Sequence, residues 1–274
     1  MTSSTSRPWT LVTGASGGIG LELAKCFARD GHPLLVTARS GDRLAAACAE
    51  LAALGAPRAE VIVLDLAAPG GAAALAAEVA RLGVAPGILV NNAGYGLVGE
   101  VAELDLEDEM AMLRLNILAL VELTKRLLPG ILAAGGAGGV LNVASTAAFQ
   151  PGPWMASYYA SKAFVLSWSE ALALELEGRT RVTCLCPGPV PTGFQGRAGF
   201  DKGNLLFSGR VPMLSADVVA RAALAGFRRG RRVVIPGFAN RLGAFSARLA
   251  PRSFAARIAG RLQRSARKAA GAAR

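Results

Sequence analysis

Residues 13–20 read Thr13-Gly14-Ala15-Ser16-Gly17-Gly18-Ile19-Gly20 and lie between a short apolar run, Trp9–Thr13, and an amphipathic stretch, Ile19–Arg29. The run predicts a strand and the stretch predicts a helix. Gly14 permits a tight turn, Gly18 lets a pyrophosphate approach the backbone, and Gly20 lets the helix pack close to the sheet. The free N–H groups at the helix start favour phosphate. The segment predicts a nucleotide-binding turn, with an ordinary glycine-rich turn as the alternative.

Apolar runs alternate with longer helical stretches along the rest of the chain. Further strands are predicted at Pro33–Ala38, Val61–Leu64, Ile88–Asn91, Gly139–Val143, Val182–Cys186 and Val233–Ile235. Helices are predicted over residues 42–54, 71–82, 106–128, 155–176 and 216–229. This alternation predicts an α/β fold, a doubly wound parallel sheet of about seven strands, the Rossmann fold. We expect one catalytic domain over residues 8–237 and a basic helical extension over residues 238–274.

The net charge of +11 is concentrated near the C-terminus. From Arg228 onward there are 13 Lys or Arg and no Asp or Glu, whereas the preceding 227 residues carry 17 basic and 19 acidic groups. A near-neutral body argues against nucleic-acid binding. Phe254, Ile258 and Leu262 recur at helical spacing beside arginines. This basic amphipathic pattern leaves three alternatives: an anionic membrane surface, an oligomer or lid contact, and a solvated helix.

The cysteines and the single histidine limit the chemistry. Cys26, Cys48, Cys184 and Cys186 form no CxxC pair, and His32 is the only histidine. We therefore expect no metal site, no disulfide framework and no triad with a histidine base. The N-terminus lacks an apolar leader, which predicts a cytoplasmic protein, with peripheral membrane attachment through the tail as an option.

The end of the second predicted strand bears on the choice of dinucleotide. It reads Thr37-Ala38-Arg39-Ser40, with no acidic residue before Asp42. Arg39 and Ser40 are suited to pair with a 2′-phosphate, whereas a carboxylate here would favour the ribose hydroxyls of NAD. The residues favour NADP(H), and NAD(H) remains the alternative.

Tyr158 and Lys162 stand four residues apart in a predicted helix and therefore share one face. An ammonium group near a phenol favours the phenolate and lowers its pKa toward neutral pH. The pair predicts a general acid/base for a carbonyl or an alcohol.

With this pair, the chain resembles the short-chain dehydrogenase/reductase family, in its short single-domain form, over about residues 8–237. The resemblance rests on several motifs in the same order as in the family. They are Thr13–Gly20, Asp65-Leu66, Asn91-Asn92-Ala93-Gly94, Asn116, Ser145, Tyr158 with Lys162, and Pro187-Gly188-Pro189-Val190-Pro191-Thr192.

The resemblance implies a role for each matching residue. Tyr158 would be the general acid/base, Lys162 would lower its pKa and hold the nicotinamide ribose, and Ser145 would bind the substrate oxygen. Asn116 would hold a water that links Lys162 to solvent, with a buried structural amide as the alternative. Asp65 would meet the adenine amine. The residues expected to bind the cofactor are Gly14, Ser16, Gly17, Gly18, Ile19, Gly20, Arg39, Ser40, Asp65, Leu66, Asn92, Ala93, Gly94, Tyr158, Lys162, Pro187, Gly188, Val190 and Thr192.

The family's activity implies an oxidoreductase acting on CH–OH donors, which transfers hydride between a nicotinamide and a carbonyl or secondary alcohol. Phe149, Trp154 and Phe194 would line an apolar substrate pocket, with Gln150, Met155, Phe200, Phe207 and Met213 nearby. A hydrophobic ketone, fatty-acyl or steroid-like substrate is expected, and a homodimer or homotetramer. The alternative is a non-catalytic NADP-sensing or membrane-docked binding protein on the same fold.

Overall fold

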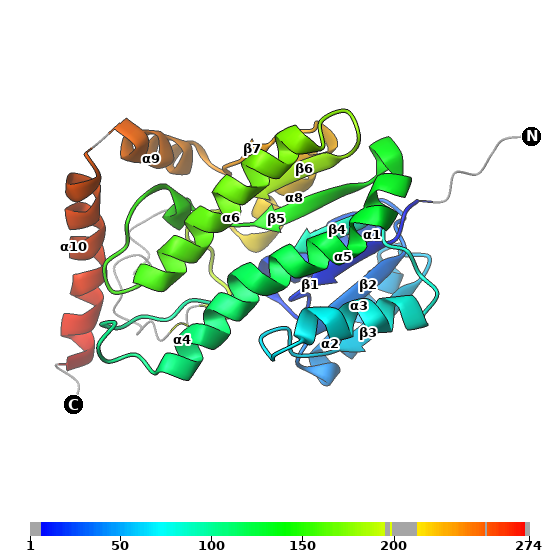
Figure 1. Ribbon diagram of the computed structural model, residues 1–274, viewed down its shortest axis with the longest axis horizontal. Coiled ribbons are helices and arrows are strands. Elements are labelled where there is room, and N and C mark those ends of the chain that lie inside the picture. The colour runs from blue at the N-terminus through cyan, green and yellow to red at the C-terminus, as the bar shows by residue number, and fades with distance from the viewer. Residues whose placement is uncertain (1–6, 195–197, 199–212, 250, 272–274) are drawn as a thin grey trace, which may run out of the picture.

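A seven-stranded parallel sheet forms the centre of the protein, for which a computed structural model describes residues 7–194, 198, 213–249 and 251–271 (Figure 1). The strand order is β3-β2-β1-β4-β5-β6-β7, and every neighbouring pair is parallel. The strands are β1 (Thr10–Thr13), β2 (Leu34–Ala38), β3 (Ala59–Val63), β4 (Ile88–Asn91), β5 (Gly139–Val143), β6 (Arg181–Leu185) and β7 (Val233–Val234). The predicted doubly wound sheet is confirmed, with strand ends that differ from the prediction by one or two residues.

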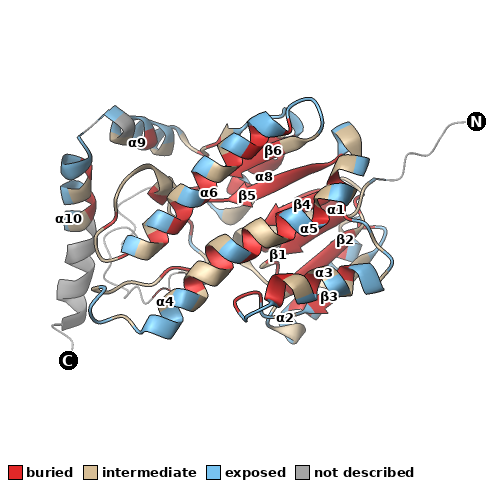
Figure 2. Cartoon of the chain, viewed as in Figure 1, coloured by how far each residue is buried: buried red, intermediate tan, exposed pale blue. Residues whose placement is uncertain are grey.

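Helices cover both faces of this sheet. They are α1 (Gly18–Arg29), α2 (Gly41–Ala53), α3 (Gly71–Arg81), α4 (Leu106–Leu113), α5 (Leu120–Ala133), α6 (Ala156–Glu175), α8 (Ala216–Arg228), α9 (Phe238–Leu249) and α10 (Arg252–Gly271). Apolar residues of α1, α2 and α8 pack on one face, and those of α3, α5 and α6 pack on the other. Successive residues of β1 alternate between these cores, with Leu11 in one and Val12 in the other. Burial of both faces explains why the strands read as continuous apolar runs (Figure 2).

The predicted helix over residues 106–128 differs from the structure. It is divided into α4 and α5 by a π-helical turn, Arg114–Ala119, and it continues to Ala133. Hydrophobic periodicity does not register the one inserted residue that widens a helical turn. Such turns often occur at functional sites, and this one contains Asn116.

The C-terminal extension is helical, as the sequence indicates. It forms two helices, α9 and α10, which are separated in sequence by Pro251. Proline cannot continue a helix that precedes it, because its ring clashes with the preceding turn. No helix among the described residues is long and apolar enough to cross a membrane.

A polar network runs through the core between β4, β5 and the helices beside them. The amide of Asn91 donates to Asn142 Oδ1 at 2.9 Å and to Thr124 Oγ1 at 3.0 Å. The amide of Asn142 in turn donates to Ser169 Oγ at 2.9 Å. All four residues are buried, and each amide or hydroxyl is satisfied by its neighbours. The network therefore ties α5 and α6 to the central strands without leaving a buried polar group unpaired.

Candidate active site

The glycine-rich turn between β1 and α1 is built as its spacing predicts. Gly14 and Gly18 have φ angles of 68° and 56°, the left-handed region that favours glycine. A Cβ on Gly20 would lie 2.4 Å from the carbonyl oxygen of Gly14, so only glycine allows this close approach. Gly17 is the N-cap of α1 and supplies no side-chain cap. The first N–H groups of the helix therefore remain available for an anion.

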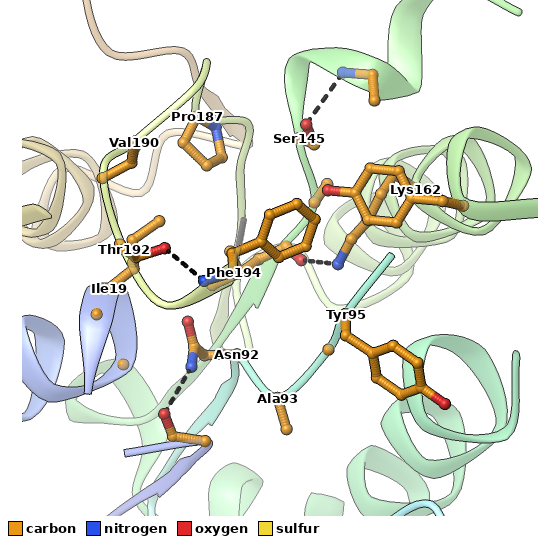
Figure 3. Close-up of a pocket in the computed structure, with 18 of the residues that line it drawn as sticks. Ile19, Asn92, Ala93, Tyr95, Ser145, Lys162, Pro187, Val190, Thr192 and Phe194 are labelled. Atoms are coloured by element: carbon orange, nitrogen blue, oxygen red, sulfur yellow. Dashed lines mark hydrogen bonds between the residues drawn. The ribbon is translucent and has the colours of Figure 1, made fainter. Parts of the chain in front are cut away.

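A cavity of about 710 Å³ opens beside this turn. It lies past the carboxyl ends of the strands, where ligands of doubly wound folds bind. Every residue predicted to bind the cofactor lines it. Ser145 and Phe194 line it as well, and both are labelled in Figure 3. The cavity therefore brings together motifs that are spread over almost 180 residues of sequence.

Basic side chains stand at one end of the cavity. Arg39 Nη1 lies 3.9 Å from Asp65 Oδ2, and Asp65 Oδ1 accepts a hydrogen bond from the backbone N–H of Ala67 at 2.9 Å. Arg43 also lines the cavity, and a Cβ on Gly17 would lie 3.0 Å from its Nη2 atom. Arg43 was not among the residues predicted from the sequence. Its position in the first turn of α2, three residues after Ser40, is the signal that identifies it.

Asn92 and Thr13 connect the ends of β4 and β1. The amide of Asn92 donates to the carbonyls of Thr13 and Gly14 at 2.9 and 3.2 Å. The hydroxyl oxygen of Thr13 accepts from the N–H groups of Asn92 and Ala93, both at 3.0 Å. The close-up shows Asn92 turned toward the start of the glycine turn (Figure 3). These contacts fix the floor of the cavity, and they occupy the Asn92 amide with backbone.

Asn116 lies in the π-helical turn and is buried behind the cavity rather than lining it. Its amide donates to the carbonyl of Tyr95 at 2.9 Å and to Ser161 Oγ at 3.0 Å, and its Oδ1 accepts from the Tyr95 N–H at 3.2 Å. Both amide hydrogens are therefore used in structure, whereas Oδ1 retains a lone pair. A Cβ on Gly94 would lie 2.9 Å from this Oδ1 and 3.3 Å from Lys162 Nζ, which places the two groups around one glycine.

Tyr158 and Lys162 lie on α6, with the Lys162 Nζ atom 5.8 Å from the centroid of the Tyr158 ring. Burial raises the pKa of the Tyr158 phenol well above its ordinary value, and a hydrogen bond with Ser145 opposes this only in part. Burial lowers the pKa of Lys162 to about 8. In the protein alone, the loss of hydration therefore outweighs the hydrogen bond with Ser145, and the lowering of the Tyr158 pKa by Lys162 stays a prediction.

The structure brings only some of the residues of the predicted substrate side to the cavity. Phe194 lines the cavity, its ring 5.6 Å from that of Tyr158, but Phe149 and Trp154 do not line it. Phe149 instead packs against a cluster that includes residues of α5, α6 and β6. Trp154 has a left-handed φ of 69°, and its carbonyl accepts from the Gly99 N–H at 2.9 Å. Gln150 and Met155 do line the cavity, Met213 does not, and Phe200 and Phe207 lie outside the described residues.

The C-terminal helices form one wall of the cavity. The sequence left such a contact open as one of three alternatives, without naming the residues that make it. Ala239, Asn240, Gly243 and Ala244 of α9 line the cavity, as does Ala259 of α10. Asn240 is held at the start of α9 by a hydrogen bond to the carbonyl of Pro236 at 2.8 Å. A Cβ on Gly188 would lie 2.4 Å from Asn240 Oδ1. The extension therefore packs directly on the turn that follows β6.

Known proteins that resemble this chain are dehydrogenases and reductases. The short chain dehydrogenase family model matches residues 8–202. Ketoacyl reductase HetN of a Nostoc strain is 32% identical over 66% of this chain, and the match spans 62% of that protein's length. A short-chain dehydrogenase of Sphingobium yanoikuyae in complex with NADPH is 35% identical, with a TM-score of 0.77 over 87% of this chain and 92% of that one. A bulky-bulky ketone specific alcohol dehydrogenase of Comamonas testosteroni is 29% identical, with a TM-score of 0.73 over 88% and 92%.

Proposed function

Since the chain belongs to the short-chain dehydrogenase family, we propose that it is an NADP(H)-dependent oxidoreductase that interconverts a carbonyl compound and a secondary alcohol. One observation carries this proposal. A single cavity has the glycine turn and Arg39 at one end, and Ser145, Tyr158 and Lys162 at the other. The first set suits a dinucleotide phosphate, and the second suits proton transfer to a reacting oxygen.

The residues present fit a dinucleotide. The uncapped start of α1 and the left-handed glycines leave a cradle of backbone N–H groups for the pyrophosphate. Arg39 and Arg43 offer two guanidinium groups for a 2′-phosphate, which favours NADP(H) over NAD(H). A bound nicotinamide supplies the hydride acceptor or donor that no protein side chain provides.

The side chains of the other end then handle the proton. Tyr158 holds its phenolic proton at neutral pH, because burial raises its pKa, and it is therefore ready to donate that proton to a carbonyl oxygen. Ser145 is hydrogen-bonded to Tyr158 and is the second donor for that oxygen. Lys162 would hold a ribose hydroxyl of the bound cofactor, and Asn116, whose Oδ1 lies near the same glycine as Lys162 Nζ, would help replace the proton.

The substrate side favours a bulky, largely apolar compound. Leu115, Met155 and Phe194 line the cavity beside Tyr158, and Gln150 is a polar group among them. The cavity of about 710 Å³ is continuous from the cofactor-binding residues to these apolar side chains. The likeness to a bulky-bulky ketone specific alcohol dehydrogenase supports the same substrate class.

The test is NADPH consumption by the purified protein across a panel of ketones, quinones and acyl thioesters. We expect turnover with at least one bulky ketone or acyl thioester, and weaker turnover when NADH replaces NADPH. Tight NADPH binding without turnover across the whole panel would count against an enzyme and favour a nucleotide-sensing protein.

A further inference from the structure

The helices α9 and α10 carry their apolar side chains in an unusual arrangement. A helix on a globular protein normally buries its large apolar residues and exposes small or polar ones. Among the side chains of α9 and α10 whose burial the structure describes, the buried ones are alanines: Ala244 on α9, and Ala255 and Ala259 on α10. The large apolar ones in this described part are exposed, with Phe238 at 80%, Phe245 at 61% and Leu249 at 72%.

These exposed residues form a stripe with helical spacing. Phe238, Leu242, Phe245 and Leu249 recur at intervals of four, three and four residues, and therefore share one side of α9. Phe254 and Ile258, four residues apart, share a side of α10. Among the described residues, 14 large apolar side chains are exposed, and six of them lie within residues 238–258. An apolar surface of this kind marks an interaction site. We call these six residues the apolar stripe.

The charge around the apolar stripe has one sign. From residue 238 to the C-terminus the sequence contains nine Lys or Arg and no Asp or Glu. Arg241, Arg252, Arg257 and Arg261 are exposed on the same two helices. A second copy of this surface would bring like charges together, which disfavours a symmetric contact. A surface with a negative potential and an apolar interior satisfies both the arginines and the stripe.

We propose that α9 and α10 dock this protein on the surface of an anionic phospholipid bilayer. The helices lie on the bilayer, with the apolar stripe in the headgroup region and the arginines against lipid phosphates. Their alanine faces stay on the protein, where they close one wall of the cavity. Docking goes beyond the proposed reaction and does not require it.

The test is co-sedimentation of the full-length protein with phosphatidylcholine vesicles prepared with and without phosphatidylglycerol. We expect binding to the anionic vesicles that weakens with added salt. The variant Leu242→Ser/Phe245→Ser should bind these vesicles at least about tenfold more weakly, because two exposed apolar side chains are lost. The variant Arg252→Gln/Arg257→Gln/Arg261→Gln should lose on the order of a hundredfold on anionic vesicles.

A matched control is Val63→Ser/Leu174→Ser, which removes two side chains of 55% exposure each from other parts of the molecule. It should bind vesicles like the wild type. NADPH binding, followed by fluorescence, checks that each variant is folded and is independent of turnover. The proposal is overturned if the wild type ignores anionic vesicles, if the control loses as much as the stripe variant, or if gel filtration shows that the stripe variant instead reduces the size of an oligomer.

Discussion

The Nζ atom of Lys162 lies 5.8 Å from the centroid of the Tyr158 ring and donates its hydrogen bond to the carbonyl of Val143, at 3.0 Å. This hydrogen bond fixes the ammonium group at the end of β5. The charge of Lys162 is thereby held beside the phenol ring of Tyr158. Burial, not the Lys162 charge, dominates the pKa of Tyr158 and keeps the phenol protonated in the protein alone.

Replacing Tyr158 by Phe removes the proton donor while keeping the ring. We expect turnover to fall by about a hundredfold to ten-thousandfold, the usual contribution of a positioned acid or base. NADPH binding should stay measurable by fluorescence titration. Turnover at the wild-type rate would show that another group donates the proton. The neighbouring Tyr159→Phe substitution is the control and should retain most activity.

Replacing Arg39 by Asp tests the 2′-phosphate contact. The new carboxylate would stand near Asp65 and repel that phosphate, so the Kd for NADPH should rise by about tenfold to a hundredfold. The Kd for NADH, which lacks the phosphate, should change little. Arg81→Asp, an exposed change on α3, serves as the control. Equal weakening of both cofactors would place the phosphate elsewhere.

The sequence was sufficient to predict those parts of the site whose geometry is determined by the local conformation of the backbone. The spacing of Gly14, Gly18 and Gly20 requires a particular turn, and Tyr158 and Lys162 share a helix face by their separation alone. Arg43 was missed because its approach to Gly17 depends on how α2 meets the glycine turn.

The C-terminal wall could not be predicted for a different reason. The large apolar residues of α9 indicate a helix face directed at the protein, but the structure directs the alanines there instead. The left-handed backbone of Trp154 likewise has no signal in sequence, because left-handed residues are usually glycine or asparagine.

Asn116 holds the backbone of Tyr95 on both sides, and Asn116→Ala should therefore lower stability. Three hydrogen bonds would be lost from buried partners, and we expect the free energy of unfolding to fall by about 2–4 kcal/mol in urea denaturation. Asn240→Ala removes one hydrogen bond at a partly buried site and should cost about 1 kcal/mol or less. Similar losses in the two variants would argue against the clamp on Tyr95.

His32 makes stability depend on pH in the acid range. Burial lowers its pKa below the ordinary 6.5, so the unfolded chain binds a proton at a pH where the native protein does not. The free energy of unfolding should therefore decrease as the pH falls below about 6.5, by up to about 1.4 kcal/mol for each unit by which the pKa is lowered. Denaturation midpoints between pH 5 and 7 should show a smaller slope for His32→Gln. An unchanged slope would assign the effect to other groups.

The buried polar network of Asn91, Asn142 and Ser169 affects the positions of the catalytic groups, although it lies in the core. Asn142 lies on β5, three residues before Ser145, which follows the end of that strand, and Ser169 follows Lys162 on α6 by two helical turns. The strand that leads into Ser145 and the helix that carries Tyr158 and Lys162 are thus joined by a buried hydrogen bond between Asn142 and Ser169. A shift of the strand or the helix along its axis would break this hydrogen bond. The spacing of Ser145, Tyr158 and Lys162 is therefore fixed by core residues that do not themselves react.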